Sequence, residues 1–382
     1  MDKFDFSFPK NMFGFHSSWN NAPGRPVGRR FYSRRPVKLA KLSECDFFRF
    51  DGTSLSAGKI RNWPIPCLVK TSTQSKNFFC DGLSSGLGSA LIRLDGVTYR
   101  LKRCGYKNRP PSRKVHFPFN ISFSYDKDVV ESFCKSYSGA ITYSSALHEC
   151  QMAKLLNHVG LCLGCEPLGI FRLPKSRNYP KNCSILILKI TSDLRLDELI
   201  FASLTPLLLE LLRSRKLIFS KAMGIFYAKN ICFREIYCEY ADIFNFIAHI
   251  AECSGKNYRR LHDSGFLRGC GSAWSGNEIV HPGGQISFVD FDGGTIPFTQ
   301  LPNNEVRDLS ARETYHAAVS FFFSFSSLNC GMFLHLATVL MHNFLSGYNS
   351  SNFMDSGLNP QKIKSVISDY QSNYKGLHKY LF

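Results

Sequence analysis

The pattern of hydrophobic and polar positions changes character about half-way along the chain. Up to about residue 191, short apolar runs of strand length are separated by turns that contain Gly, Pro and Asp. After Leu199, apolar residues recur with a helical period, most clearly over residues 241–261. These patterns predict an α+β protein with a strand-rich N-terminal lobe over residues 44–191 and a mainly helical C-terminal lobe over residues 192–382.

A glycine-rich turn and a lysine flank two predicted strands of the N-terminal lobe. Gly86 and Gly88 precede the first strand, an Asp-Gly pair typical of a tight hairpin follows it, and Val97–Lys102 forms the second. Glycines let the backbone approach phosphate groups closely and direct its N–H groups at them. We therefore expect Gly86 and Gly88 to bind phosphate, with Lys102 reaching the same group.

A helix is predicted to begin near Ser144 and Ser145, which are good N-cap residues. Its apolar positions form one stripe, and Glu149 leans towards that side of the helix. Burying an unpaired carboxylate is costly, so a buried Glu149 requires a cationic side chain beside it. The alternative is a partly exposed helical glutamate.

A predicted hairpin in the C-terminal lobe carries oxygen ligands at both ends. Residues 278–280 and 285–291 are apolar runs on either side of a Pro-Gly-Gly turn. Asn277 precedes the first run and Asp290 ends the second, so the hairpin would bring their side chains together. Such oxygen ligands suit Mg²⁺ that is also bound to phosphate. Asn and Asp are also common in ordinary turns, which is the simpler alternative.

The order of these motifs resembles that of the protein-kinase-like superfamily. Residues 261–269 (Leu-His-Asp-Ser-Gly-Phe-Leu-Arg-Gly) are similar to the helix end that leads into a kinase catalytic loop, and Asn277 matches the metal-binding asparagine of that loop. Asp290-Phe291-Asp292 stands at the position of Asp-Phe-Gly. The resemblance implies a two-lobed kinase-like fold, with one key helix on an antiparallel N-terminal sheet, and ATP and Mg²⁺ as cofactors.

The resemblance also implies a role for each motif residue. The two glycines and Lys102 would bind the nucleotide phosphates, Glu149 would pair with Lys102, and Asn277 and Asp290 would hold Mg²⁺. The linker after the predicted strand at 184–190 would hold the adenine through its backbone.

A second, fainter resemblance concerns residues 101–105 and 163–169. Together with the helix between them, they are similar to the selenoprotein-O branch of the superfamily, which transfers AMP rather than phosphate.

The predicted catalytic loop departs from the kinase pattern. No carboxylate lies between Asp263 and Asn277, and the place of the catalytic aspartate falls on Cys270 or on Ser272, depending on the direction of counting. Neither side chain is an adequate general base near neutral pH. The usual mechanism of acceptor activation is therefore in doubt.

Arg268 and Asp292 are further candidates for a catalytic role. Arg268 stands where kinases usually have His, and it would help to neutralise charge on the transferred group. Asp292 would be a second metal ligand or the missing base, and a surface aspartate in a turn is the alternative.

The charge of the chain favours an acidic partner. Lys and Arg exceed Asp and Glu by 47 to 29, which gives a formal net charge of +18. Residues 1–43 are predicted to form a flexible basic arm, since the stretch from Arg25 to Lys41 contains seven basic residues and no acidic one. Nucleotide, nucleic acid, an acidic protein or anionic lipid would each suit this charge.

The sequence predicts a cytoplasmic protein. It has neither a signal-peptide pattern nor an apolar run of the ~20 residues that a membrane helix needs. Its 14 cysteines lack the dense spacing of a disulfide scaffold.

Three functions follow from these features. The first is an ATP- and Mg²⁺-dependent kinase-like transferase that moves a phosphoryl or AMP group to a hydroxyl of a protein or small molecule. The second is a pseudokinase that acts as a nucleotide-binding or scaffold protein, which the missing loop aspartate favours. The third is a nucleic-acid-binding protein, which the positive charge favours.

Overall fold

The structure is a computed structural model, and it describes the elements that carry most of the predicted site. Gly86, Gly88, Asp292 and the segment 1–35 lie outside the described residues. Side chains are described from residue 89 onward. The described residues are 36–41, 46–50, 55–58, 67–70, 78–84, 89–102, 141–172, 183–214, 216–220, 225–228, 231–268, 273, 275–281, 284–291, 295–298, 306–307, 309–311, 313–314, 317–318, 320–321, 328–329 and 331–350.

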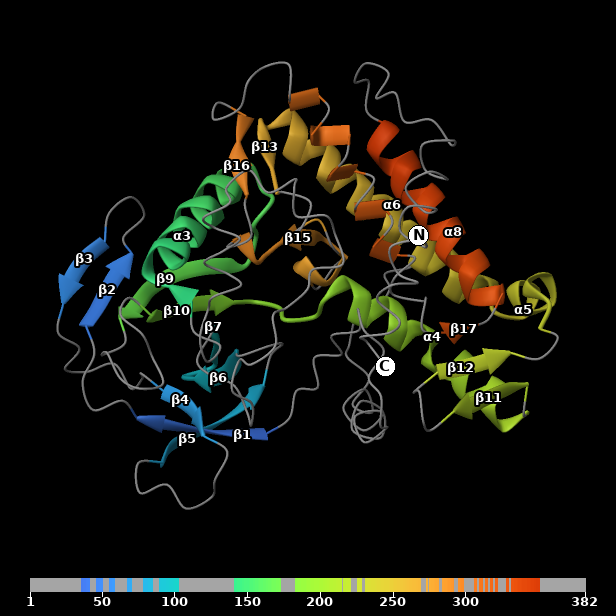
Figure 1. Ribbon diagram of the computed structural model, residues 1–382, viewed down its shortest axis with the longest axis horizontal. Coiled ribbons are helices and arrows are strands. Elements are labelled where there is room, and N and C mark those ends of the chain that lie inside the picture. Colours follow the sequence, from blue (N-terminus) through green and yellow to red (C-terminus); the bar gives the residue numbers. More distant parts are fainter. Residues whose placement is uncertain are drawn as a thin grey trace.

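An antiparallel sheet forms the N-terminal part of the structure (Figure 1). Its strand order is β3-β2-β9-β10-β7-β6-β5-β1-β4, with β8 paired to β10. The antiparallel N-terminal sheet predicted from the sequence is thus confirmed. The strands are β1 (Pro36–Lys41), β2 (Asp46–Phe50), β3 (Leu55–Gly58), β4 (Cys67–Lys70), β5 (Phe78–Ser84), β6 (Ala90–Leu94), β7 (Val97–Lys102), β8 (Ile141–Thr142), β9 (Cys165–Arg172) and β10 (Cys183–Ile190).

Strand β1 corrects the extent of the predicted basic arm. Residues 36–41 pair with both β4 and β5. The last part of the segment 1–43 therefore belongs to the sheet, because its alternating apolar positions suit a strand despite its basic residues.

The hairpin between β6 and β7 forms at the predicted Asp-Gly turn. Asp95 and Gly96 have φ angles of 50° and 78°. Two positive φ angles in succession match the right-handed twist of the flanking strands, and Asp-Gly tolerates them well. The turn sets the register of β7 and so determines which face of the sheet Lys102 lies on.

Helix α3 (Tyr143–His158) covers part of the sheet. Its N-cap is Thr142, whose hydroxyl accepts a hydrogen bond from the Ser145 backbone N–H at 3.2 Å. The N-cap predicted at Ser144 and Ser145 is therefore wrong. The helix begins directly after β8, and the threonine there satisfies a free N–H of its first turn.

The C-terminal part is mainly helical, as predicted, and its helices α6 and α8 pack along each other (Figure 1). The predicted hairpin forms as β14 and β15, and further short strands that the sequence did not predict lie among the helices. The helices are α4 (Leu196–Arg213), α5 (Phe233–Glu239), α6 (Ala241–Asp263) and α8 (Gly331–Asn349). The shorter elements are β11 (Leu217–Ser220), β12 (Ile225–Ala228), β13 (Phe266–Leu267), η3 (Ser275–Asn277), β14 (Glu278–Val280), β15 (Ile286–Phe288), β16 (Ile296–Pro297) and β17 (Leu328–Asn329).

Two glycines allow α6 and α8 to approach closely. A Cβ atom on Gly255 would lie 1.9 Å from the carbonyl oxygen of Phe344, and one on Gly347 would lie 2.0 Å from that of Glu252. Both distances are impossible for real atoms, so the two helices can cross in this way only where neither has a side chain.

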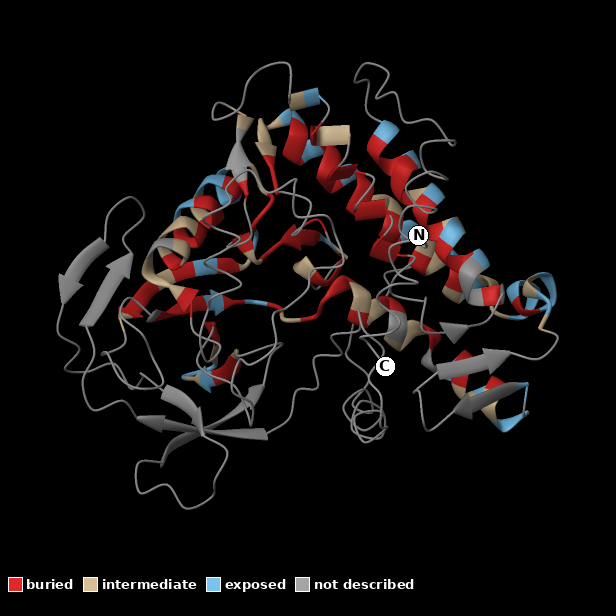
Figure 2. Ribbon diagram, viewed as in Figure 1, coloured by how far each residue is buried: buried red, intermediate tan, exposed pale blue. Residues whose placement is uncertain are grey.

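One continuous hydrophobic core joins the sheet, α3 and the helical part. Figure 2 shows the buried residues following the inner sides of α3, α6 and α8 and the hairpin between them. Among the described residues, no helix combines the length and apolarity needed to span a membrane.

Candidate functional site

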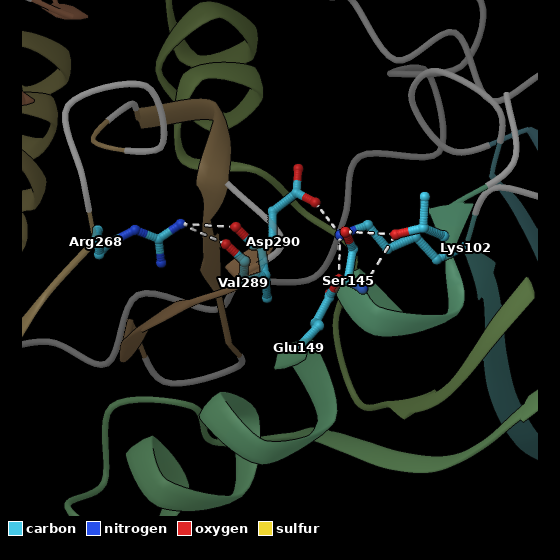
Figure 3. Close-up of polar contacts among 7 residues, drawn as sticks. Lys102, Ser145, Glu149, Arg268, Val289 and Asp290 are labelled. Carbon is cyan, nitrogen blue, oxygen red and sulfur yellow. Dashed lines mark hydrogen bonds and ion pairs between the residues drawn. The ribbon is translucent and has the colours of Figure 1, made fainter. Parts of the chain in front are cut away.

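Lys102 lies at the centre of the candidate site (Figure 3). Its ammonium group donates a hydrogen bond to Glu149 Oε2 on α3 at 2.5 Å and also contacts Asp290 Oδ1 at the end of β15. Lys102 and Glu149 are only 5% and 1% exposed. Opposite charges offset the cost of burying each other. The contact joins the two residues that the sequence predicted to pair, Lys102 and Glu149.

Asn277 and Asp290 are brought together by the predicted hairpin. Strands β14 and β15 pair with Glu278 opposite Phe288, and the Val289 N–H donates to the Asn277 carbonyl at 3.0 Å. Asn277 therefore lies beside the residue that precedes Asp290. The Asp290 side chain remains 21% exposed.

The backbone of Asp290 has an uncommon conformation. Its φ angle is 71°, in the left-handed region that is unfavourable for most residues but tolerated by Asp and Asn. Asp290 lies two residues after the end of β15, and its carboxylate points towards Lys102 (Figure 3).

Arg268 is fully buried behind the Asp290 segment. Its guanidinium group donates hydrogen bonds to the carbonyl of Val289 at 2.6 Å and to that of Asp290 at 3.4 Å. It also lies over the rings of Phe288 and Phe291, 4.8 Å and 5.2 Å from their centroids. Arg268 is therefore placed to hold the Asp290 backbone. This placement is less suited to the predicted role, in which Arg268 contacts the transferred group.

Glu278 is a buried carboxyl that the sequence analysis did not single out. Burial raises its pKa to about 8, although the hydroxyl of Ser254 and the nearby Arg268 lower it in part. The Ser254 hydroxyl lies 2.7 Å and 2.9 Å from its two carboxyl oxygens. Its sequence signal was a carboxylate immediately after Asn277, at the start of a short apolar run. In the structure every residue of this strand is buried.

A second ion pair near Lys102 was also missed. Arg100, two residues before Lys102 on β7, contacts Asp193 of the linker that follows β10. Strand alternation alone places Arg100 and Lys102 on the same face. The partner of Arg100 is not evident from the sequence, because it lies more than ninety residues away in the chain.

The remaining predicted site residues, Gly86, Gly88 and Asp292, lie outside the described residues. Their predicted roles in binding phosphate and metal stay predictions.

No protein-family model matches this chain, and no curated protein matches it. Two solved structures from Toxoplasma gondii are similar to it. One is a specific rhoptry antigen kinase domain, at 7% identity over 88% of this chain and 87% of that one, with a TM-score of 0.33. The other is a rhoptry kinase, at 8% identity over 94% and 96%, with a TM-score of 0.30.

Both neighbours are named as kinases. The resemblance to the AMP-transferring selenoprotein-O branch finds no support among them. Both TM-scores are low, so the contacts of Lys102 and its neighbours are the features of this chain that bear on its function.

Proposed function

We propose that this chain is a kinase-like transferase that binds ATP with Mg²⁺ and moves a phosphoryl or AMP group to a hydroxyl of a protein or small molecule. The observation that carries the proposal is the position of Lys102. It contacts carboxylates from two elements far apart in the sequence, Glu149 on α3 and Asp290 after β15. A buried lysine held between two carboxylates is a fixed positive charge suited to phosphate groups.

Lys102 and the residues around it each have a separate role in binding the nucleotide phosphates. Lys102 binds the nucleotide phosphates and Glu149 orients its ammonium group. The predicted glycine turn covers the same phosphates. Arg268 fixes the backbone on which Asp290 stands, so that the carboxylate keeps its direction.

The side-chain oxygen atoms of Asn277 and Asp290 are of the chemical type that would hold a magnesium ion. They come from adjoining backbone segments that hydrogen-bond to each other, and Mg²⁺ commonly binds one or two protein oxygens together with phosphate oxygens. The described residues contain no group of three or more His, Cys, Asp or Glu side chains that could hold a metal without phosphate. When bound, the ion would offset negative charge on the phosphates.

A pseudokinase is the second candidate. It is favoured by the lack of a carboxylate between Asp263 and Asn277, since a general base for the acceptor must then come from elsewhere, for example from Asp292. Such a protein would bind nucleotide through the same residues without transferring a group.

The proposal is tested by thermal-shift titration with ATP, with and without Mg²⁺. We expect Mg²⁺-ATP to raise the melting temperature by mass action and Asp290→Asn, which keeps the size and the φ tolerance of the residue, to remove the dependence on Mg²⁺. Lys189→Ala, on the opposite face of the sheet, is the control and should respond like the wild type.

The outcomes separate the candidates. Transfer from labelled ATP in the wild type, lost in Asp290→Asn, supports the transferase. A thermal shift that is indifferent to metal, without transfer, supports the pseudokinase. The absence of a shift with any nucleotide excludes both.

A further inference from the structure

We propose that the ion pair between Arg100 and Asp193 fills the site where a kinase-like protein would hold the nucleobase. The ligand of the Lys102 site is then recognised through its phosphates and not through its base. This inference rests on the proposed function, because it concerns which part of the donor the protein binds.

The register of the sheet places Arg100 between Lys102 and the linker that follows β10. Arg100 and Lys102 are two residues apart on β7, so their side chains leave the same face. Arg100 stands opposite Leu188 and Lys102 opposite Leu186. Since β10 runs from Leu186 towards the linker, Arg100 is the nearer of the two to the linker, on the side where the base of a phosphate-bound nucleotide would lie.

The guanidinium group crosses from the sheet to the linker. Arg100 Nη2 contacts Asp193 Oδ1, and the two side chains are only 4% and 8% exposed. A base inserted between the sheet and the linker would have to displace the guanidinium and leave a nearly buried carboxylate without its partner. Breaking a buried pair in this way is strongly unfavourable.

The linker cannot make room by moving away. On one side of Asp193, the Ser192 hydroxyl donates to the Val280 carbonyl at 2.6 Å. On the other side, the Val280 N–H donates to the Leu194 carbonyl at 2.8 Å. Both bonds tie the linker to strand β14, so Asp193 is fixed between two anchored neighbours.

Backbone groups of the linker that would bind a base edge are already engaged. The Thr191 N–H donates to the Gly164 carbonyl at 2.9 Å, and the Leu194 N–H donates to the Ser192 hydroxyl at 3.3 Å. The Leu194 carbonyl accepts from Val280. An adenine would have to replace these bonds as well as the ion pair.

Removing the pair should create an apolar site for a base. Leu91 and Leu188 stand opposite Arg100 on the two neighbouring strands and share its face of the sheet. Both are buried, at 7% and 1% exposure. With Arg100 and Asp193 shortened, these two side chains would present an apolar surface on which a base can pack.

The test compares Mg²⁺ complexes of ATP, GTP and inorganic tripolyphosphate by isothermal titration calorimetry. For the wild type we expect the three affinities to agree within about threefold, since a base that makes no contact adds little binding free energy. Arg100→Ala/Asp193→Ala should gain about tenfold or more for ATP but not for tripolyphosphate. Glu166→Ala/Lys189→Ala removes an exposed ion pair from the same sheet and should match the wild type.

The possible results distinguish a failure of this inference from a failure of the proposed function. A wild type that prefers ATP to tripolyphosphate by tenfold overturns the inference and leaves the proposed function intact. No binding of any triphosphate overturns both. Equal wild-type affinities without a gain in the double variant would show that the pair is not the cause. If the double variant does not fold, Arg100→Leu/Asp193→Leu keeps more volume, and the wild-type comparison still decides.

Discussion

Lys102 and Asp290 meet because of backbone geometry as well as charge. Asp290 stands at a φ of 71°, a conformation that Asp and Asn adopt at low cost and β-branched residues avoid. Arg268, buried behind it, donates hydrogen bonds to the carbonyls of this segment. At the scale of single residues, Lys102 supplies the positive charge of the site, and Arg268 holds the backbone from which the Asp290 carboxylate points towards it.

The buried carboxyl of Glu278 makes the stability of the fold depend on pH. Its pKa is raised to about 8 in the folded protein, against a usual value of 4.5. The folded state therefore holds an extra proton between these two values, and stability must fall as the pH rises through that window. We expect urea unfolding of the wild type to lose roughly 1 kcal/mol per pH unit there, relative to Glu278→Gln.

Ser254→Ala provides a second test of the pH dependence of stability that Glu278 causes. The Ser254 hydroxyl lowers the pKa of Glu278, so its removal should extend the sensitive window to higher pH. Parallel stability curves for the wild type and Glu278→Gln would contradict the assignment.

The sequence singled out the polar residues that meet around Lys102 and the β14–β15 hairpin, but not the residues that surround them. Lys102, Glu149, Asn277 and Asp290 were found because each lies in a short local motif. The Arg100 pair was missed because its partner depends on strand register and on the path of the linker. The position of Arg268 behind the Asp290 segment likewise depends on tertiary packing.

At the scale of elements, the crossing of α6 and α8 depends on glycine. Gly255 and Gly347 each face a backbone carbonyl of the other helix at a distance that excludes a side chain. The sequence predicted α6 closely, over residues 241–261 against Ala241–Asp263, because its apolar period is strong. The sequence did not indicate that Gly255 lies in a helix contact, since a helical pattern does not show which other helix will pack against a given face.

Gly255→Ala should destabilise the protein although alanine favours a helix. The added methyl group would force the two backbones apart, and overpacking of this kind typically costs about 1–3 kcal/mol, which exceeds the gain of up to ~1 kcal/mol in helix propensity. Chemical unfolding measures the difference. Lys256→Ala, at the exposed neighbouring position, should change stability by less than about 1 kcal/mol, and an unchanged or raised stability of Gly255→Ala would contradict the crossing.

At the scale of the whole molecule, the strand-rich and helical parts are joined rather than merely adjacent. Their side chains form one hydrophobic core, and hydrogen bonds cross between them. The Phe288 N–H donates to the Leu161 carbonyl at 2.8 Å, and the His148 ring bonds the Thr295 carbonyl at 2.8 Å. The boundary predicted near residue 192 is a change of secondary structure within this common core.

We therefore expect the two parts to unfold together. Scanning calorimetry should give one transition whose calorimetric enthalpy equals the van't Hoff enthalpy. His148→Ala, which removes one of the crossing hydrogen bonds, should lower the melting temperature without splitting the transition. Two separate peaks would show that the parts are independent.

The anchored linker also has a consequence for the speed of ligand exchange. Ser192 and Leu194 are both bonded to β14 at Val280, so the chain offers no free pivot at this point about which the two parts could swing open. A ligand of the proposed site would then have to enter while local groups move aside, and such gating would slow association well below the rate of free diffusion. The same restraint would retard release, so we expect a weakly binding ligand also to dissociate slowly.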